Sequence, residues 1–187
     1  MALSKIGTNS LEDLSVTSGK VANDGIGPTQ LDETANYSFS GTVTGAGGVN
    51  TPAFLAYANS DQTGISADTY TKITNYGVEV FDTDNKFSNY RFTPGVAGKY
   101  FIFGTAYLQH YGSERTWIAI YKNGSIHTLG NSDMPNSAAS YPLQVTGIVE
   151  MPNTTDYVEI FVRQLGTGTT AFSSGVSVKF GGYKIIE

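Results

Sequence analysis

Apolar and polar residues alternate over short stretches from residue 51 to the end of the chain. In the clearest stretch, 157–164, the apolar Val158, Ile160 and Val162 alternate with polar residues such as Glu159. Side chains of a strand point alternately to its two faces, so this two-residue period predicts strands with one buried face. The same pattern predicts further strands at 53–58, 69–73, 77–81, 100–108, 116–122, 125–129, 143–151, 176–180 and 182–186. Because no stretch has the helical period, the sequence predicts an all-β sandwich or jelly roll.

Two of these stretches carry specific expectations. In 77–81 the alternation places Val78 and Val80 inside and Glu79 outside. Asn123 and Gly124 separate two predicted strands, and this dipeptide is a strong signal for a two-residue hairpin turn.

The stretch 100–108 differs from the others because both of its faces are apolar. One face carries Tyr100, Ile102, Ala106 and Leu108, and the other carries Phe101, Phe103 and Tyr107. A turn built on Pro94, Gly95 and Gly98 precedes it. An antiparallel strand in a two-layer sandwich needs only one apolar face. The second face, that of Phe101, Phe103 and Tyr107, therefore predicts a third layer, most simply another copy of the chain in a symmetric oligomer.

Residues 1–36 have a different pattern, with apolar residues at a five-residue interval. These positions are Ile6, Leu11, Val16, Val21, Ile26 and Leu31. A five-residue interval produces neither a stripe on a helix nor one face of a strand. We interpret the segment as an extended docking arm that lies along identical arms or on another protein; the alternative is a disordered leader. Residues 37–51 are rich in glycine and predict a linker, and 52–187 form the globular head.

Composition narrows the class of protein. Charged residues make up 14% of the chain, the formal net charge is −5, and there is no cysteine. Disulfides and cysteine-ligated metals are therefore excluded, and the acidic balance argues against a nucleic-acid partner. No apolar run reaches the length of a membrane span, so we expect no membrane partner. The N-terminus has no apolar signal-peptide core, which predicts synthesis in a cytosol.

The head also carries motifs at 81–82, 87, 91–94 and 98–100, supported by 53–57, 119–124 and 180–183. With these residues, Thr51 to Glu187 resembles the C1q/tumour-necrosis-factor-like jelly-roll family, although Ile102 stands where the family often has an aromatic residue. The resemblance implies a ten-stranded jelly roll that forms homotrimers about a three-fold axis.

The arm, with phrases such as LEDLSVTSGKVANDGI, resembles the leaders of tailed-phage fibre and decoration proteins. Together the two resemblances imply a non-enzymatic virion structural protein. Such a homotrimer would be assembled in the host cytoplasm, dock by its arm to capsid or tail proteins, and lie on the virion surface as a capsid decoration protein or short fibre. The alternative is the receptor-binding head of a tail fibre, engaging a host glycan or protein through loops that carry Met134, Tyr141 and Phe172.

The remaining candidate chemistry is sparse. Asp82 and Asp84 resemble the start of a calcium loop, but the later glycine and glutamate ligands are missing, so an Asx turn is favoured over a calcium site. The two histidines, His110 and His127, are expected at the surface or in loops. We therefore expect no cofactor and no enzymatic activity.

Overall fold

The computed structural model describes residues 50–110, 115–133, 139–165, 169–171, 175 and 177–185. The predicted arm, its six apolar docking positions and nearly all of the linker lie outside these residues, so their boundaries stay predictions. None of the described residues forms a helix long and apolar enough to cross a bilayer. Where it is described, the chain is built of strands and turns, which confirms the all-β prediction.

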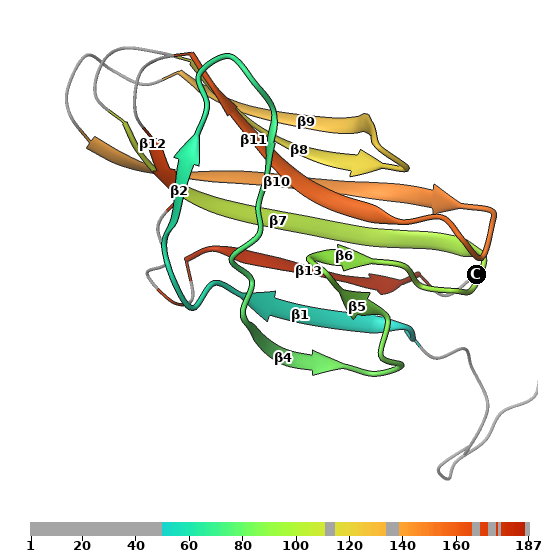
Figure 1. The fold of residues 1–187 in the computed structure, drawn as a ribbon. Helices are drawn as coiled ribbons and strands as arrows, with labels where there is room; N and C mark the ends of the chain where they lie inside the picture. The colour runs from blue at the N-terminus through green and yellow to red at the C-terminus, as the bar shows by residue number, and fades with distance from the viewer. Residues whose placement is uncertain are drawn as a thin grey trace, which may run out of the picture. The chain divides into compact units, whose positions relative to one another are not determined.

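The described strands form two antiparallel sheets (Figure 1). The first, sheet A, contains β4 (Val78–Asp82), β1 (Ala53–Tyr57), β13 (Lys179–Lys184), β7 (Gly98–His110) and β10 (Ala139–Met151), side by side in that order. The second, sheet B, contains β5 (Phe87–Ser88), β6 (Arg91–Phe92), β11 (Val158–Gln164), β8 (Arg115–Lys122) and β9 (Ser125–Asp133). These ten strands have the two-sheet arrangement of a jelly roll, which confirms the predicted architecture.

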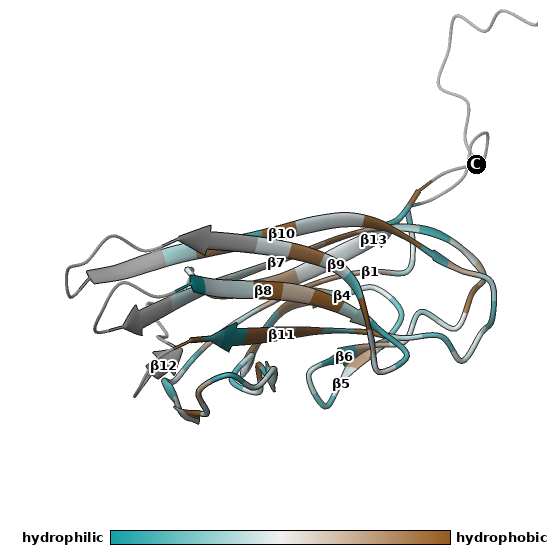
Figure 2. Cartoon of the chain, turned by 90° about the horizontal axis from the view of Figure 1, so that it is seen from above, coloured by the Kyte–Doolittle hydropathy of each residue, from teal (hydrophilic) through white to brown (hydrophobic). Residues whose placement is uncertain are grey.

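Three further short strands extend this framework. In sheet A, β12 (Thr169–Ala171) pairs with the far end of β7, and β2 (Gln62–Ile65) pairs with β12. In sheet B, β3 (Thr71–Lys72) pairs with β11. Seen from above, β10 and β13 of sheet A lie on one side and β11, β6 and β5 of sheet B on the other, while β8 and β9 overlap the remaining strands (Figure 2).

The core fills the space between the two layers with aromatic and branched side chains. Phe54 of β1 stacks on Phe92 of β6 at 4.3 Å between ring centroids, and its edge meets the ring of Phe180 at 4.8 Å. Tyr100, at the start of β7, is also buried, and its hydroxyl donates a hydrogen bond of 2.7 Å to the carbonyl of Val96. The inward positions of β10 and β11 are buried as predicted: Val145, Val149, Met151, Val158, Ile160 and Val162.

The turns follow the predicted chemistry. Asn123 and Gly124 both have positive φ, at 50° and 79°, and join β8 to β9 as a two-residue hairpin. Gly95, with φ of 73°, lies in the turn before β7, and Gly98 has φ of 151° at the start of that strand. These are backbone conformations that glycine adopts without a steric penalty.

The prediction that Val80 lies inside is wrong because β4 contains a bulge. Phe81 pairs with Leu55 and Glu79 pairs with Ala56, which leaves Val80 as the extra residue. Val80 is 51% exposed, so it is not inside. The bulge reverses the expected alternation and places Glu79 in register with the buried Ala56, but the Glu79 side chain, at the edge of the sheet, is exposed as predicted.

Two other expectations need correction. The two strands predicted at 176–180 and 182–186 are one strand, β13, which runs through Gly181 and Gly182 without interruption. In a sequence, two glycines indicate the end of a strand. Here β13 pairs with β1 on one side and β7 on the other, and this pairing keeps both glycines extended. Glu159 lies on the outward side of β11 as predicted, yet it is 4% exposed because cationic side chains cover it.

One side of the sandwich is closed by close backbone contact. A methyl group on Gly130 of β9 would lie 2.5 Å from the carbonyl oxygen of Gln144 in β10. A methyl group on Gly147 of β10 would lie 2.9 Å from the hydroxyl of Thr128 in β9. Glycine at both positions therefore allows the outer strands of the two sheets to meet directly.

Candidate functional site

The outward face of sheet A carries a group of partly exposed apolar side chains, here called the aromatic face. It consists of Leu55, Phe81, Phe101, Phe103, Ile148 and Tyr183. Register brings them together in two adjacent rows across the strands. In one row Ile148, Phe101 and Tyr183 are neighbours, and in the next row Phe103, Gly181, Leu55 and Phe81 follow one another.

The rings of the aromatic face contact one another. Phe101 lies 5.5 Å from Tyr183 and 6.3 Å from Phe103, measured between ring centroids. The ring of Phe103 covers Gly181, since a methyl group on that glycine would lie 2.5 Å from the ring. Beside Phe103 and Tyr183 the face contains a hollow of about 310 Å³, which Leu55 and Phe81 also line. The surface is thus apolar and indented, which suits a protruding apolar side chain of a partner.

The structure separates Tyr107 from the other two residues predicted with it. Phe101 and Phe103 both belong to the aromatic face, but the next row along β7 contains Thr105, paired with Gln144 and Lys179. Tyr107 lies beyond this polar row, on the same side of the sheet, and also packs against the core. Sequence reasoning missed Phe81, Tyr183 and Ile148, because their proximity to Phe101 depends on strand pairing that no local pattern specifies.

The outward face of sheet B carries a second group, here called the arginine–aromatic strip. Arg163 lies over the rings of Trp117, at 4.9 Å, and Tyr70, at 5.6 Å, and donates a hydrogen bond of 3.1 Å from Nε to Asp68. Arg115 lies 5.9 Å from Trp117. The strip continues through Tyr121, whose ring is 5.7 Å from Tyr70 and stacks on Phe161 at 4.0 Å.

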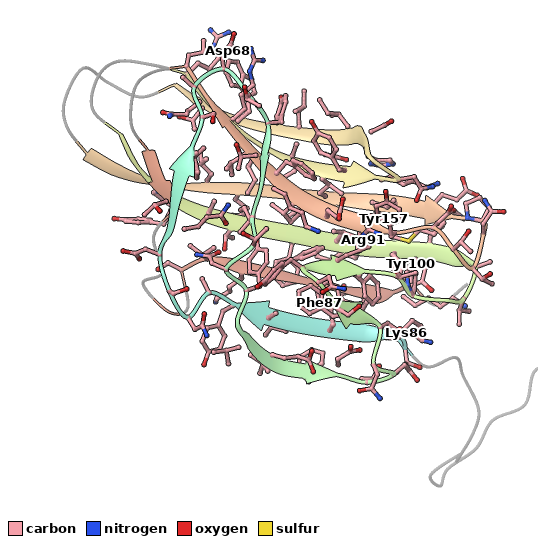
Figure 3. All side chains as sticks on the ribbon, in the orientation of Figure 1. Asp68, Lys86, Phe87, Arg91, Tyr100 and Tyr157 are labelled. Carbon is pink, nitrogen blue, oxygen red and sulfur yellow. The ribbon has the colours of Figure 1, made fainter. Side chains whose placement is uncertain are left out.

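The remaining arginine, Arg91, also lies over an aromatic ring, and it contacts a buried carboxylate. The Arg91 guanidinium lies 3.7 Å from the ring centroid of Tyr157, and both side chains are labelled in Figure 3. Its Nε donates to Glu159 Oε1 at 2.9 Å, and Lys72 Nζ donates to the same oxygen at 2.6 Å. Two cations therefore share one carboxylate that is withdrawn from water, an arrangement that is strongly destabilised when one partner is removed.

Asp82 and Asp84 lie in the turn between β4 and β5. The Asp82 carboxylate accepts hydrogen bonds from the backbone N–H of Phe87, at 2.6 Å, and of Asp84, at 3.4 Å. The Asp84 carboxylate accepts one from the hydroxyl of Thr83 at 2.8 Å. This is the geometry of the favoured Asx turn. Within the described part of the chain, no three His, Asp or Glu side chains are grouped to hold a metal ion; calcium binding stays an untested alternative.

The loop candidates are mostly outside the described residues. Met134 and Phe172 fall there, while Tyr141 belongs to β10, of which only the backbone is described at that point. His110 is the last residue of β7. His127 is exposed on β9, and its Nδ1 lies 2.8 Å from the hydroxyl of Thr128.

The fold is similar to that of several solved structures. A crystal structure of murine APRIL at pH 5.0 matches with a TM-score of 0.53 and 9% identity, over 71% of this chain and 98% of that chain. Eiger TNF from S. frugiperda matches with a TM-score of 0.53 and 8% identity, over 71% of this chain and 91% of that chain. The globular domain of zebrafish complement 1qA has 17% identity and a TM-score of 0.48, over 72% of this chain and 96% of that chain.

No family model matches the sequence, and no curated protein matches it. Identities of 9% to the APRIL structure and 8% to the Eiger structure are evidence about the fold alone. The strand order described above and these two likenesses show that residues 50–185, where described, have a jelly-roll fold similar to that of the APRIL and Eiger TNF structures.

Proposed function

We propose that this protein is a structural protein of a tailed-phage virion. In this proposal it is a homotrimer that docks to capsid or tail proteins by its N-terminal arm and displays the jelly-roll head outward on the virion surface. A capsid decoration protein or a short fibre has this organisation. No enzymatic step is part of the proposal.

The observation that carries the self-association is the aromatic face. Phe81 is 46% exposed, Tyr183 40% and Ile148 60%, and they adjoin Phe101 and Phe103 on one side of one sheet. Burying a side chain of this size in an interface contributes roughly 1.5–3 kcal/mol to the free energy of association. A contiguous apolar surface that stays open favours aggregation, and a closed symmetric interface removes that surface.

A second apolar region supports a ring of subunits. Ile126 and Leu129 of β9 are 45% and 52% exposed, and β9 is the edge strand of sheet B, where it adjoins β10 of sheet A. When one region of a subunit contacts a different region of its neighbour, the contacts close into a ring if the rotation allows it. The number three comes from the resemblance to C1q/TNF-like proteins, which also implies the three-fold axis.

The arm supports the docking role. Its apolar residues recur every five positions from Ile6 to Leu31, and short polar residues separate them. Thirty-six extended residues at about 3.3 Å each could span on the order of 120 Å, enough to cross neighbouring subunits of a capsid or a fibre shaft. The resemblance of this segment to phage leader sequences is the reason for placing the partner in a virion.

The experiment that tests this proposal compares the full chain with a variant that lacks residues 1–36. We expect the full chain to sediment with the mass of three chains and to be incorporated into phage particles that lack their own copy. The shortened variant should keep the trimeric mass and fail to be incorporated. Incorporation of the shortened variant would disprove arm docking, and a monomeric full chain at micromolar concentration would disprove the trimer.

The second candidate function is a receptor-binding head that engages a host glycan or protein. The arginine–aromatic strip favours it, because the faces of aromatic rings beside charged groups suit stacking and hydrogen bonding to a ligand. Trp117→Ala should then abolish binding of the full chain to host cells, whereas Ile148→Ser, on the other sheet, should leave cell binding unchanged. Equal cell binding by wild type and Trp117→Ala would count against this role for the strip.

A further inference from the structure

A pocket of about 300 Å³ lies where the β4 edge of sheet A adjoins the β5–β6 edge of sheet B; we call it the seam pocket. The side chains that line it include Tyr76, Glu79, Phe87, Ser88, Asn89 and Tyr90. We propose that the seam pocket binds an organic cation of the alkylammonium class. The proposal does not depend on a virion role or on the trimer.

The bulge in β4 supplies the negative charge of the pocket. Without the bulge at Val80, the alternation would turn Glu79 outward; with it, Glu79 pairs with Ala56 and its exposed side chain lines the pocket. The Glu79 side chain has no ion-pair or hydrogen-bond partner among the described residues. Bulges that re-aim a side chain are over-represented beside binding sites.

The hairpin between β5 and β6 forms the opposite wall in a strained conformation. Ser88 pairs with Arg91, so Asn89 and Tyr90 make a two-residue turn, with φ of 51° and 58°. The second position of such a turn strongly favours glycine, and an aromatic residue there is uncommon. Strain of this kind persists where the surroundings impose it, and it is concentrated at ligand sites.

The surroundings of this turn do impose its conformation. Lys72 Nζ donates a hydrogen bond of 2.9 Å to the carbonyl of Asn89 and is held in turn by the buried Glu159. The ring of Phe87 packs against the core, with its centroid 4.9 Å from that of Phe54 and 5.7 Å from that of Phe180. The aromatic walls are therefore fixed before any ligand arrives, which lowers the entropic cost of binding.

The composition of the lining selects the ligand. Among the described residues that line the pocket, Glu79 is the charged one and no lysine or arginine is included, so the lining favours a cationic ligand over an anionic one. A carboxylate without a counter-ion, beside the aromatic Tyr76, Phe87 and Tyr90, attracts a cation through ion pairing and through the negative faces of the rings. An alkylammonium group presents both positive charge and apolar methyl groups, and so matches both parts of the lining.

The test titrates the full chain with choline and, separately, with its neutral carbon isostere, in which a tert-butyl group replaces the trimethylammonium group. Binding is followed by calorimetry and by NMR shifts of the residues of the seam pocket. We expect choline to bind about tenfold more tightly than the isostere, because a cation–π contact and an ion pair each favour the charged ligand. A neutral monosaccharide mixture serves as the third probe.

Three variants complete the experiment. Glu79→Gln should reduce choline affinity about tenfold, whereas Glu150→Gln, an exposed carboxylate on β10, should leave it unchanged. Tyr90→Asn keeps a residue that tolerates positive φ and removes the ring, so it should weaken binding while the protein stays folded. Equal affinity for choline and its isostere, tighter binding of a saccharide, or no binding of any probe would each overturn the proposal.

Discussion

At the scale of single residues, glycine decides how closely the two layers pack. Gly104 of β7 points into the core, and a methyl group there would lie 2.7 Å from Cδ1 and 2.9 Å from Cγ1 of Ile160. Real Cβ atoms do not approach other atoms so closely, and the neighbouring strands prevent β7 from moving away. The inward face of the central strand thus depends on the absence of a side chain at one position.

Gly104→Ala should therefore destabilise the protein by about 1–3 kcal/mol, the usual cost of overpacking. Chemical denaturation at fixed protein concentration measures this cost. Ile160→Val removes Cδ1, the nearest atom, so Gly104→Ala should cost less in that background than alone. Strictly additive effects of the two substitutions would contradict direct contact as the cause.

At the scale of elements, the carboxylate of Asp156 connects the hairpin of β8 and β9 to the loop before β11. Asp156 accepts hydrogen bonds from Asn123 Nδ2, at 2.8 Å, and from the backbone N–H of Asn153, at 3.1 Å, with Lys122 Nζ at 3.5 Å. The pKa of Asp156 is lowered, first by the hydrogen bond from Asn123 and then by those from Asn153 and the charge of Lys122, against an opposing effect of burial. The ionised carboxylate is thus the form that joins the two turns.

Because its folded-state pKa is depressed, Asp156 stabilises the fold above the ordinary carboxyl pKa, and this stabilisation is lost as the pH falls through the lowered value. Asp156→Asn should therefore unfold at lower urea concentration than wild type at neutral pH. The two urea midpoints should converge as the pH is lowered through the acid range. Glu150→Gln is the matched control, and a difference that stays constant with pH would show that the charge of Asp156 is not responsible.

At the scale of the whole molecule, the two sheets have outward faces of different character. Sheet A presents the aromatic face, whereas the rings on sheet B lie among arginine and lysine side chains that share carboxylates. A closed ring of subunits, in which the aromatic face of one subunit contacts β9 of the next, needs both regions. Ile148→Asp and Leu129→Asp should therefore each reduce the sedimenting mass of the full chain. Val96→Asp, at a similarly exposed position outside both regions, should keep the wild-type mass.

Pairing of two aromatic faces with each other would give a different result in the same measurement. In that case Ile148→Asp would dissociate the protein, while Leu129→Asp would leave it assembled. Both residues are exposed in the described structure, at 60% and 52%, so neither substitution removes core packing. Far-UV spectra of the variants would confirm that the fold is kept.

Several parts of the structure could be predicted from the sequence because they depend on local chemistry. The alternation at Val158, Ile160 and Val162 places them in the core, and Asn123 and Gly124 form the hairpin turn. Both faces of β7 were recognisable as apolar for the same reason, since period and turn preference require only neighbouring residues. The arm positions, the loop residues and the calcium alternative stay predictions.

The tertiary structure alone decided which residues meet. Phe81 and Tyr183 join Phe101 because strands far apart in the chain pair in one register, and a polar row sets Tyr107 apart from them. Glu79 faces the seam pocket because β4 bulges against β1. The sequence by itself determined which stretches are strands, which side of most of them is apolar, and where the chain turns. Register, bulges and the pairing of distant strands were decided only on folding, since they minimise the free energy of the whole sandwich and not of any one segment.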